Sequence, residues 1–194
     1  DGNSNFVDLT CGSGTILIEA ARYALNIHPM KSRTYFGFKG WSDFDYKLYQ
    51  RIMDDLESRE KEPNVKIIGT DISAITAQVA KRNIRFAGLE GKIEVRSRAF
   101  QKMVAPEAPG IVISNPPYDE RLQEEDIEGL YYELGEKLFH DFKGYEAWLI
   151  SSNLNALKKI SLKTQRRVKL MNGPLEAFYR GYKINAEGEE DEVS

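Results

Sequence analysis

The chain has 194 residues, of which 41% are hydrophobic and 29% charged, and its 27 basic and 30 acidic side chains give a net charge of −3. The length is that of one domain of ordinary size, or of one domain with a small attachment, and the composition is typical of a soluble globular protein. The single cysteine, Cys11, excludes an internal disulfide, and the two histidines, His28 and His140, lie in no metal-ligand pattern, so no metal site is predicted. No apolar run approaches the ~18 residues of a membrane span, and the first five residues do not resemble a signal peptide. We therefore expect a cytoplasmic protein that does not enter a membrane.

Short apolar runs alternate along the chain with amphipathic helical patterns. The patterns predict strands at 6–9, 65–70, 92–96, 110–114 and 146–151, and helices at 15–26, 46–60, 73–87 and 127–142. Ser73 is the expected N-cap of the third helix, and Gly88 follows its end. Two further strands, at 164–171 and 175–184, flank an Asn-Gly-Pro turn and are predicted to form an antiparallel pair.

This order predicts an α/β fold: a Rossmann-like, seven-stranded, mostly parallel sheet with helices on both faces and a carboxy-terminal antiparallel β-pair. We expect one domain over residues 1–185, with an inserted segment at 28–62, and an acidic disordered tail at 186–194. Phe38 and Trp41 in the insertion are expected to pack in its own core, with a place beside the substrate as the alternative. Ligands of such sheets bind at the carboxyl ends of the strands. A site is therefore expected near Asp8, Asp71 and Asn115.

A glycine loop, Asp8-Leu9-Thr10-Cys11-Gly12-Ser13-Gly14-Thr15, joins the first strand to its helix. Its glycines allow the backbone to turn tightly and approach a ligand. Leu17 stands where the dinucleotide fingerprint requires a third glycine, and no Gly-Lys-Ser/Thr follows, so neither phosphate-binding pattern fits. Asp8 and Glu19 add negative charge near the helix start, which disfavours a pyrophosphate and favours a cationic cofactor such as S-adenosylmethionine. A simple strand-to-helix turn is the alternative.

Asp71 ends the second predicted strand, where a carboxylate can accept both ribose hydroxyls of an adenosine. The next residue, Ile72, is placed to pack on the adenine face. The alternative is that Asp71 only caps the following helix.

The segment Asn115-Pro116-Pro117-Tyr118 directly follows a buried apolar strand. The prolines fix the backbone, which leaves the Asn115 side-chain oxygen and the Pro116 carbonyl as fixed acceptors for an exocyclic amino group. Tyr118 presents a ring on which a base can stack. The segment therefore predicts methyl transfer to the amino group of a base, with these four residues as the catalytic segment. A rigid turn with a surface tyrosine is the alternative.

These two motifs resemble those of class I S-adenosylmethionine-dependent amino-methyltransferases. With the aromatic segment at 35–45 and the segment at 169–176, the chain is most similar to the bacterial THUMP-associated 23S rRNA guanine-N2 methyltransferases, once labelled N6-adenine DNA methylases. The resemblance covers nearly all of residues 5–184 and implies methylation of guanine N2 of 23S rRNA, with adenine N6 of DNA or RNA as the alternative. It assigns the methionine end of the cofactor to Asp8, Cys11, Gly12, Ser13, Gly14 and Thr15, the adenosine to Asp71 and Ile72, and the target base to Asn115, Pro116 and Tyr118.

The sequence departs from this family pattern after the third strand. Ala99 stands where an acid usually reads the adenine amino group, so Phe100 is predicted to pack on the adenine ring instead. Family members also carry an amino-terminal THUMP region that binds RNA, which we expect to be missing here.

Two questions stay open at this point. The six basic residues between 158 and 169 indicate either an RNA contact or a solvated strand edge. A nucleotide-dependent oxidoreductase and a non-catalytic scaffold are further alternatives, opposed by the missing third glycine and by the intact segment from Asn115 to Tyr118.

Overall fold

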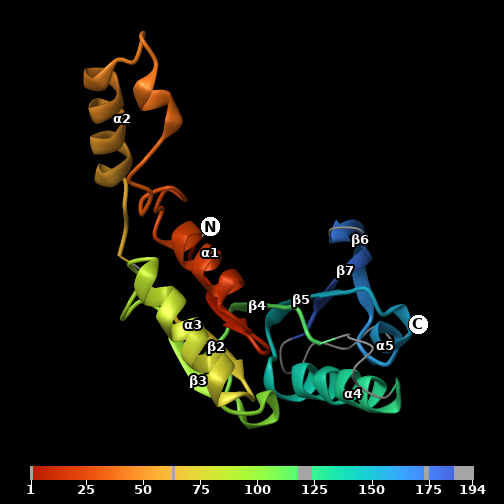
Figure 1. Cartoon of the computed structure of the whole chain (residues 1–194). Helices are drawn as coiled ribbons and strands as arrows, with labels where there is room; N and C mark the ends of the chain where they lie inside the picture. The colour runs from red at the N-terminus through yellow and green to blue at the C-terminus, as the bar shows by residue number, and fades with distance from the viewer. Residues whose placement is uncertain (1, 63, 118–123, 173–174, 186–194) are drawn as a thin grey trace.

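The sheet is the centre of the fold in this computed structural model, which describes residues 2–62, 64–117, 124–172 and 175–185. Within these residues seven strands pair in the order β3-β2-β1-β4-β5-β7-β6 (Figure 1). The strands are β1 (Asn5–Asp8), β2 (Ile67–Asp71), β3 (Glu94–Ser97), β4 (Gly110–Ser114), β5 (Tyr145–Ser151), β6 (Thr164–Asn172) and β7 (Leu175–Lys183). Strands β1 to β5 are parallel, and β7 pairs antiparallel with both β5 and β6. The predicted fold class is confirmed.

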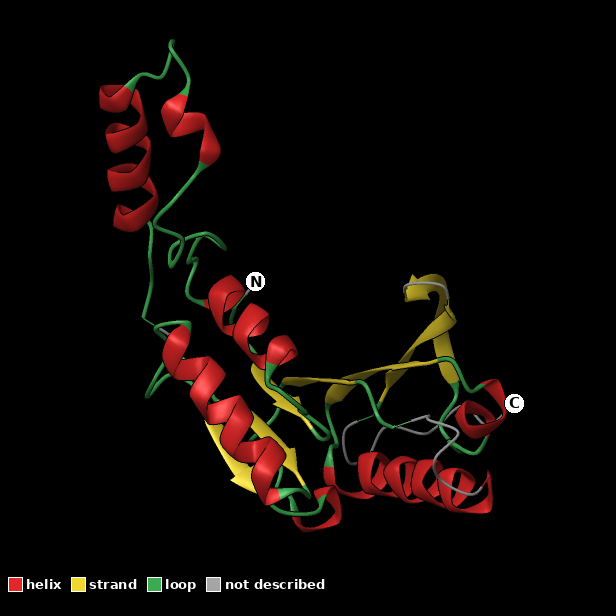
Figure 2. Ribbon diagram, in the orientation of Figure 1, coloured by secondary structure: helices red, strands yellow, loops and turns green. Residues whose placement is uncertain are grey.

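Helices cover both faces of this sheet (Figure 2). The described helices are α1 (Thr15–Ala24), α2 (Tyr46–Ser58), α3 (Ala74–Phe86), α4 (Glu124–Asp141) and α5 (Leu154–Lys158), with short 3-10 turns η1 (Gly37–Gly40) and η2 (Phe100–Lys102). Of these, α2 and η1 lie away from the sheet (Figure 1). Helix α4 begins three residues before the predicted start at 127 and α1 ends at Ala24 rather than at 26. Helix α5 was not predicted, because five residues are too short to show a helical period.

The apolar core has two parts, one on each face of the sheet. Alternation along β4 divides its side chains: Val112 packs on the α4 side, while Ile111 and Ile113 point to the side of α1 and α3. On the α4 side the core includes the fully buried Tyr131, whose hydroxyl donates a hydrogen bond to Ser151 Oγ at 2.8 Å. The two cores together fix the strand ends, because β1, β2 and β4 contribute to both.

Helix α3 shows how local sequence sets these boundaries. The Ser73 hydroxyl accepts a hydrogen bond from the Thr76 N–H at 3.2 Å, which is the predicted N-cap. Gly88 adopts φ +72°, the left-handed conformation that ends helices and favours glycine. The helix therefore begins and ends near the predicted residues.

The inserted segment at 28–62 projects from the sheet as an arm formed by η1 and α2 (Figure 1). Its rings contact one another: Phe38 lies 5.2 Å from Phe36 and 6.5 Å from Trp41 between ring centroids. No residue of α2 is buried, and Trp41 is 68% exposed. The arm follows the end of α1 that lies opposite the glycine loop, so its backbone lies away from the carboxyl ends of the strands (Figure 2). The predicted packing of the insertion on itself is observed, but it gives a small cluster rather than a buried core.

No helix in the described ranges is both long enough and apolar enough to cross a membrane.

Candidate active site

The three predicted site positions meet at one edge of the sheet. Strand β1 lies between β2 and β4, with Asp8 in register with Gly69 and Val7 in register with Val112. Because the three strands are parallel, their carboxyl ends lie side by side. Asp8, Asp71 and Asn115 are thereby brought together, as the order of the motifs predicts.

Asp8 is the buried acid of this site. It is only 1% exposed, and its Oδ1 accepts hydrogen bonds from the Ser114 hydroxyl at 2.8 Å and from the Thr10 N–H at 3.1 Å. The Ser114 oxygen in turn accepts the Leu9 N–H at 2.8 Å. The other carboxylate oxygen, Oδ2, is buried and has no hydrogen-bond partner within the described part of the chain. A buried carboxylate oxygen without a partner is costly unless a ligand supplies a donor or a cation.

Burial raises the pKa of Asp8 from 3.8 to about 7, against the lowering effect of the hydrogen bonds from Ser114 and Thr10 and with a further rise from the nearby Asp71 charge. An adjacent cation favours the charged form of such an acid. Asp8 therefore fits the ammonium group of S-adenosylmethionine, and a phosphate in this place would meet a buried acid.

The glycine loop holds its shape through backbone hydrogen bonds. The Cys11 N–H donates to the Thr70 carbonyl and the Gly14 N–H donates to the Cys11 carbonyl, both at 2.8 Å. Gly12 and Gly14 adopt φ +53° and +84°, and a Cβ at Gly14 would lie 3.2 Å from Ala80 Cβ. No described atom lies within 4 Å of a Cβ built at Gly12, so the loop is open to a ligand there.

The other three loop residues differ in exposure. Ser13 and Thr15 are exposed, and their hydroxyl oxygens lie 3.2 Å apart. Cys11 is 6% exposed and packs in the core beneath α1. Burial raises the pKa of its thiol to about 12, so the thiolate is absent at neutral pH. Cys11 therefore acts as a packing residue rather than a nucleophile.

Asp71 links the second strand to the glycine loop. Its Oδ2 accepts the Gly12 N–H at 3.1 Å, and its Oδ1 accepts the Ser73 N–H at 2.8 Å. The helix cap itself is Ser73, so Asp71 is not the capping residue of α3. A carboxylate oxygen can accept two hydrogen bonds, so each Asp71 oxygen keeps capacity for a ribose hydroxyl. Ile72 is 79% exposed at the same edge, so its side chain is accessible to an adenine there.

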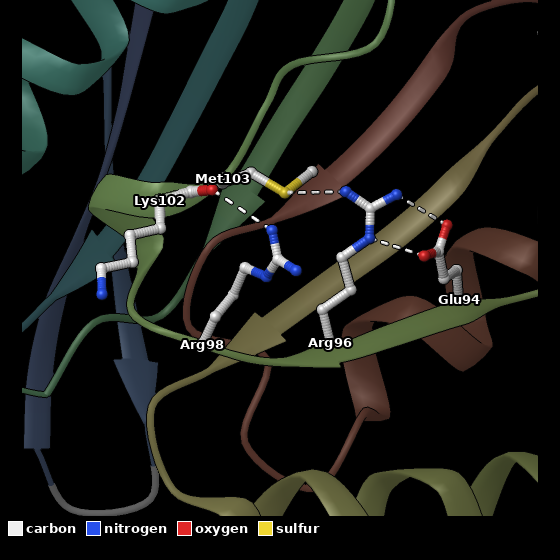
Figure 3. A network of polar contacts seen from close by, with 5 residues as sticks. All are labelled: Glu94, Arg96, Arg98, Lys102 and Met103. Atoms are coloured by element: carbon white, nitrogen blue, oxygen red, sulfur yellow. Dashed lines mark hydrogen bonds and ion pairs between the residues drawn. The ribbon is translucent and has the colours of Figure 1, made fainter.

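Two arginine side chains, Arg96 and Arg98, make polar contacts along β3 and the loop that follows it (Figure 3). Arg96 donates two hydrogen bonds to Glu94, at 2.6 and 2.9 Å, and its Nη1 lies 4.0 Å from Met103 Sδ. Arg98 Nη1 donates to the Lys102 carbonyl at 3.4 Å, and the Arg98 N–H donates to the Asp71 carbonyl at 2.9 Å. The last of these hydrogen bonds joins the loop after β3 to Asp71, the residue predicted to bind ribose.

Phe100 follows in this loop and is 6% exposed within the core on the α4 side. Its ring therefore contacts the core, and packing against an adenine stays a prediction.

The segment after β4 begins with the exposed Asn115, followed by the buried Pro116 and the exposed Pro117. Tyr118 lies outside the described residues, so its place beside a base stays a prediction. Ser114, which precedes Asn115, was not predicted as a site residue. Its only sequence signal is a hydroxyl at the end of an apolar strand, and the hydrogen bond to Asp8 depends on strand register. The described residues contain no cluster of three or more potential metal ligands.

The chain is similar in sequence to known proteins. Residues 1–180 match the family model described as "RMKL-like, methyltransferase domain". The chain is 35% identical over 182 residues to the ribosomal RNA large subunit methyltransferase K/L of Marinomonas sp. (strain MWYL1), and 35% identical over 188 residues to the protein of that name in Shewanella baltica (strain OS185). These matches cover 90% and 94% of this chain but only 25% and 26% of the relatives. The chain thus spans about a quarter of the length of these curated relatives.

Solved structures share the fold. SMU.472, a protein assigned as a methyltransferase and crystallised with SAH, has a TM-score of 0.87 at 29% identity, with 95% of this chain and 49% of that chain covered. A protein from Listeria monocytogenes described as a predicted N6-adenine-specific DNA methylase has a TM-score of 0.83 at 28% identity, with 94% and 47% covered. The chain belongs to the RMKL-like methyltransferase domain family.

Proposed function

We propose that this chain is the catalytic domain of an S-adenosylmethionine-dependent RNA methyltransferase that modifies guanine N2 of 23S rRNA. The observation that carries the proposal is the junction of Asp8, Ser114 and Asn115. Ser114 donates a hydrogen bond to Asp8, the acid proposed to hold the cofactor. It also directly precedes Asn115, the residue predicted to hold the target amino group. Cofactor and base would therefore meet at the adjoining ends of β1 and β4.

The mechanism follows from what these residues offer. S-adenosylmethionine, when bound, supplies a methyl group on a sulfonium that is already electrophilic. Asp8 holds the positively charged methionine end, while Asp71 and Ile72 hold the adenosine. The Asn115 side-chain oxygen and the Pro116 carbonyl accept the two amino N–H groups of the base and stabilise the positive charge that develops on its nitrogen. As the new N–CH3 bond would form, the S–CH3 bond would break and S-adenosylhomocysteine would leave, and the methylated amino group would release one proton to solvent. The chain's main contribution is alignment.

The choice of RNA as substrate rests on the relatives, whose names specify large-subunit ribosomal RNA. We expect a cytoplasmic protein with its catalytic domain at residues 1–185, and an amino-terminal THUMP region elsewhere in the protein that adds RNA affinity. Adenine-N6 methylation of DNA is the second candidate, favoured by the name of the Listeria structure. The motif chemistry is the same for guanine and adenine, so identification of the methylated nucleoside is needed to distinguish the two candidates.

The cofactor assignment is tested by calorimetry with S-adenosylmethionine and, in parallel, with NAD. We expect binding of S-adenosylmethionine alone. Binding of NAD without S-adenosylmethionine would reject the assignment. The substrate is tested by incubating the full-length protein with unmodified 23S rRNA or with DNA and identifying the methylated nucleoside by mass spectrometry. N2-methylguanosine in the RNA supports the proposal, while N6-methyladenine in DNA supports the second candidate.

The role of Asn115 is tested by Asn115→Ala in the full-length protein. Since one fixed acceptor would be lost at the reacting nitrogen, kcat should fall by about 100-fold or more while S-adenosylmethionine affinity is retained. The matched control is Asn155→Ala, an exposed asparagine on α5. Turnover that is unchanged in Asn115→Ala would remove this residue from the mechanism.

A further inference from the structure

Positive charge is concentrated in the last quarter of the described chain. Residues 158–183 contain eight Lys or Arg and one acid, Glu176, for a net charge of +7. The whole chain carries −3, so all other residues together carry −10. Such a separation does not arise from an evenly mixed surface, and clustered bases are the electrostatic signature of binding to phosphate.

Three of these bases, Arg166, Arg167 and Lys169, lie on β6, the outer strand of the sheet, while Arg180 lies on the neighbouring β7 and Lys158 ends α5. Strand β6 ends the strand order, and residues 165–171 are all exposed along it. We define the basic edge as Lys158, Arg166, Arg167, Lys169 and Arg180.

Some of these charges already have partners. Lys169 pairs with Glu176 across the hairpin at 2.5 Å, and Arg180 Nη1 donates to the Leu157 carbonyl at 3.2 Å. No ion pair with another described residue holds Lys158, Arg166 or Arg167. These three cations are therefore available to a ligand.

Strand register connects the basic edge to the active site. Ser114 is in register with Leu149 on β5, Leu149 with Arg180 on β7, and Arg180 with Arg167 on β6. Arg167 thus lies on the same cross-strand row as the residue before Asn115, three strand spacings away, or about 14 Å at ~4.8 Å per strand. That distance corresponds to about four nucleotides at ~3.4 Å each.

The hairpin also extends past the site edge. Ser151, the last residue of β5, is in register with Phe178, and the pairs from Leu170–Ala177 to Asn172–Leu175 lie beyond it. The far end of β6 and β7 therefore overhangs the edge from which Asn115 emerges. A strand of nucleic acid that enters this edge would pass beside the hairpin.

We propose that the basic edge binds the phosphate backbone of the RNA that flanks the target base. The proposal rests on the proposed function, because it takes RNA as the substrate. Protection of an edge strand from pairing with another chain would account for exposed bases, but it requires no alignment with the active site.

The test compares Arg166→Gln/Arg167→Gln with the matched control Lys81→Gln/Arg82→Gln, two adjacent exposed bases on α3 near the opposite end of the sheet. The ligand is a fluorescent RNA hairpin of 23S sequence, and its affinity for the full-length protein is measured at several salt concentrations. We expect the edge variant to bind about tenfold more weakly near 0.1 M salt, with the slope of log K against log salt reduced by about 1.4, while the control matches the wild type.

Two further readouts separate the alternatives. Calorimetry with S-adenosylmethionine should give the same affinity for all three proteins, and the KM for RNA should rise in the edge variant while kcat at saturating RNA is retained. Equal RNA affinity in both variants would show that the basic edge does not bind RNA, and it would leave the proposed function intact. Self-association of the edge variant with unchanged RNA affinity would assign the bases to edge protection instead. Wild-type protein that methylates DNA and binds no RNA would overturn both.

Discussion

At the scale of single residues, Asp8 should make stability depend on pH. Its pKa is raised to about 7 by burial, far above the unfolded value, so folding favours its protonated form. This contribution is fully present below about pH 4 and is lost as pH rises through about 7, with a magnitude on the order of 4 kcal/mol. Urea unfolding without cofactor should show this loss between pH 4 and 8, and Asp8→Asn should not show it. An identical pH dependence in both proteins would contradict the assigned pKa.

Ser114 should affect both stability and the acid that it holds. Ser114→Ala removes the donor to Asp8 Oδ1 and leaves the buried Leu9 N–H without its acceptor. The free energy of unfolding should fall by about 1–3 kcal/mol, and the pKa of Asp8 should rise further because a hydrogen bond to its charged form is lost. Chemical denaturation and the pH dependence of S-adenosylmethionine binding measure the two effects. The control is Ser161→Ala, whose exposed hydroxyl bonds Glu136 at 3.2 Å and should matter by less than about 0.5 kcal/mol.

At the scale of elements, the close approach of β4 and β5 explains why residue 110 is a glycine. A Cβ at Gly110 would lie 1.9 Å from a ring carbon of Tyr145, which is fully buried and stacks edge-to-face on Phe142 at 5.2 Å. Gly110→Ala should therefore destabilise the fold by about 1–3 kcal/mol through overpacking. Gly129→Ala in α4 meets no atom within 4 Å and should instead stabilise by up to ~1 kcal/mol. Thermal unfolding of the two variants should shift in opposite directions.

Elements also show how far the sequence can be interpreted. Motifs with a fixed local chemistry, such as the glycine loop and Asn115-Pro116-Pro117, were placed correctly at strand ends because a parallel sheet brings those ends together. Ser114 was missed, since its hydrogen bond to Asp8 spans 106 residues and depends on register. Helix α5 was missed because one and a half turns carry no period. The inserted segment was expected to have its own core. The pattern of apolar residues predicts that its rings cluster, but it cannot predict whether other residues shield that cluster from solvent.

At the scale of the whole molecule, the arm should be separable from the fold. Its two ends are close together: Asn26 Nδ2 donates to the Arg59 carbonyl at 2.9 Å, and the Lys61 N–H donates to the Leu25 carbonyl at 2.8 Å. Because α2 contains no buried residue, replacing residues 30–57 with a short Gly-Ser linker should shift the thermal midpoint by only a few degrees. Cofactor affinity should be unchanged in calorimetry. Loss of a single cooperative transition would show that the arm supports the sheet.

The hydrogen bond between Gly12 and Asp71 has a consequence for the rate of cofactor binding. Since the carboxylate already anchors the loop to the end of β2, the loop loses its conformational entropy when the chain folds rather than when the ligand arrives. Association should then follow a single exponential, with a rate that increases linearly with ligand concentration and shows no plateau from a slow loop closure. In Asp71→Ala the backbone hydrogen bonds of Cys11 and Gly14 remain, but the Gly12 part of the loop would lose its anchor and sample more shapes, only a fraction of which would accept the ligand.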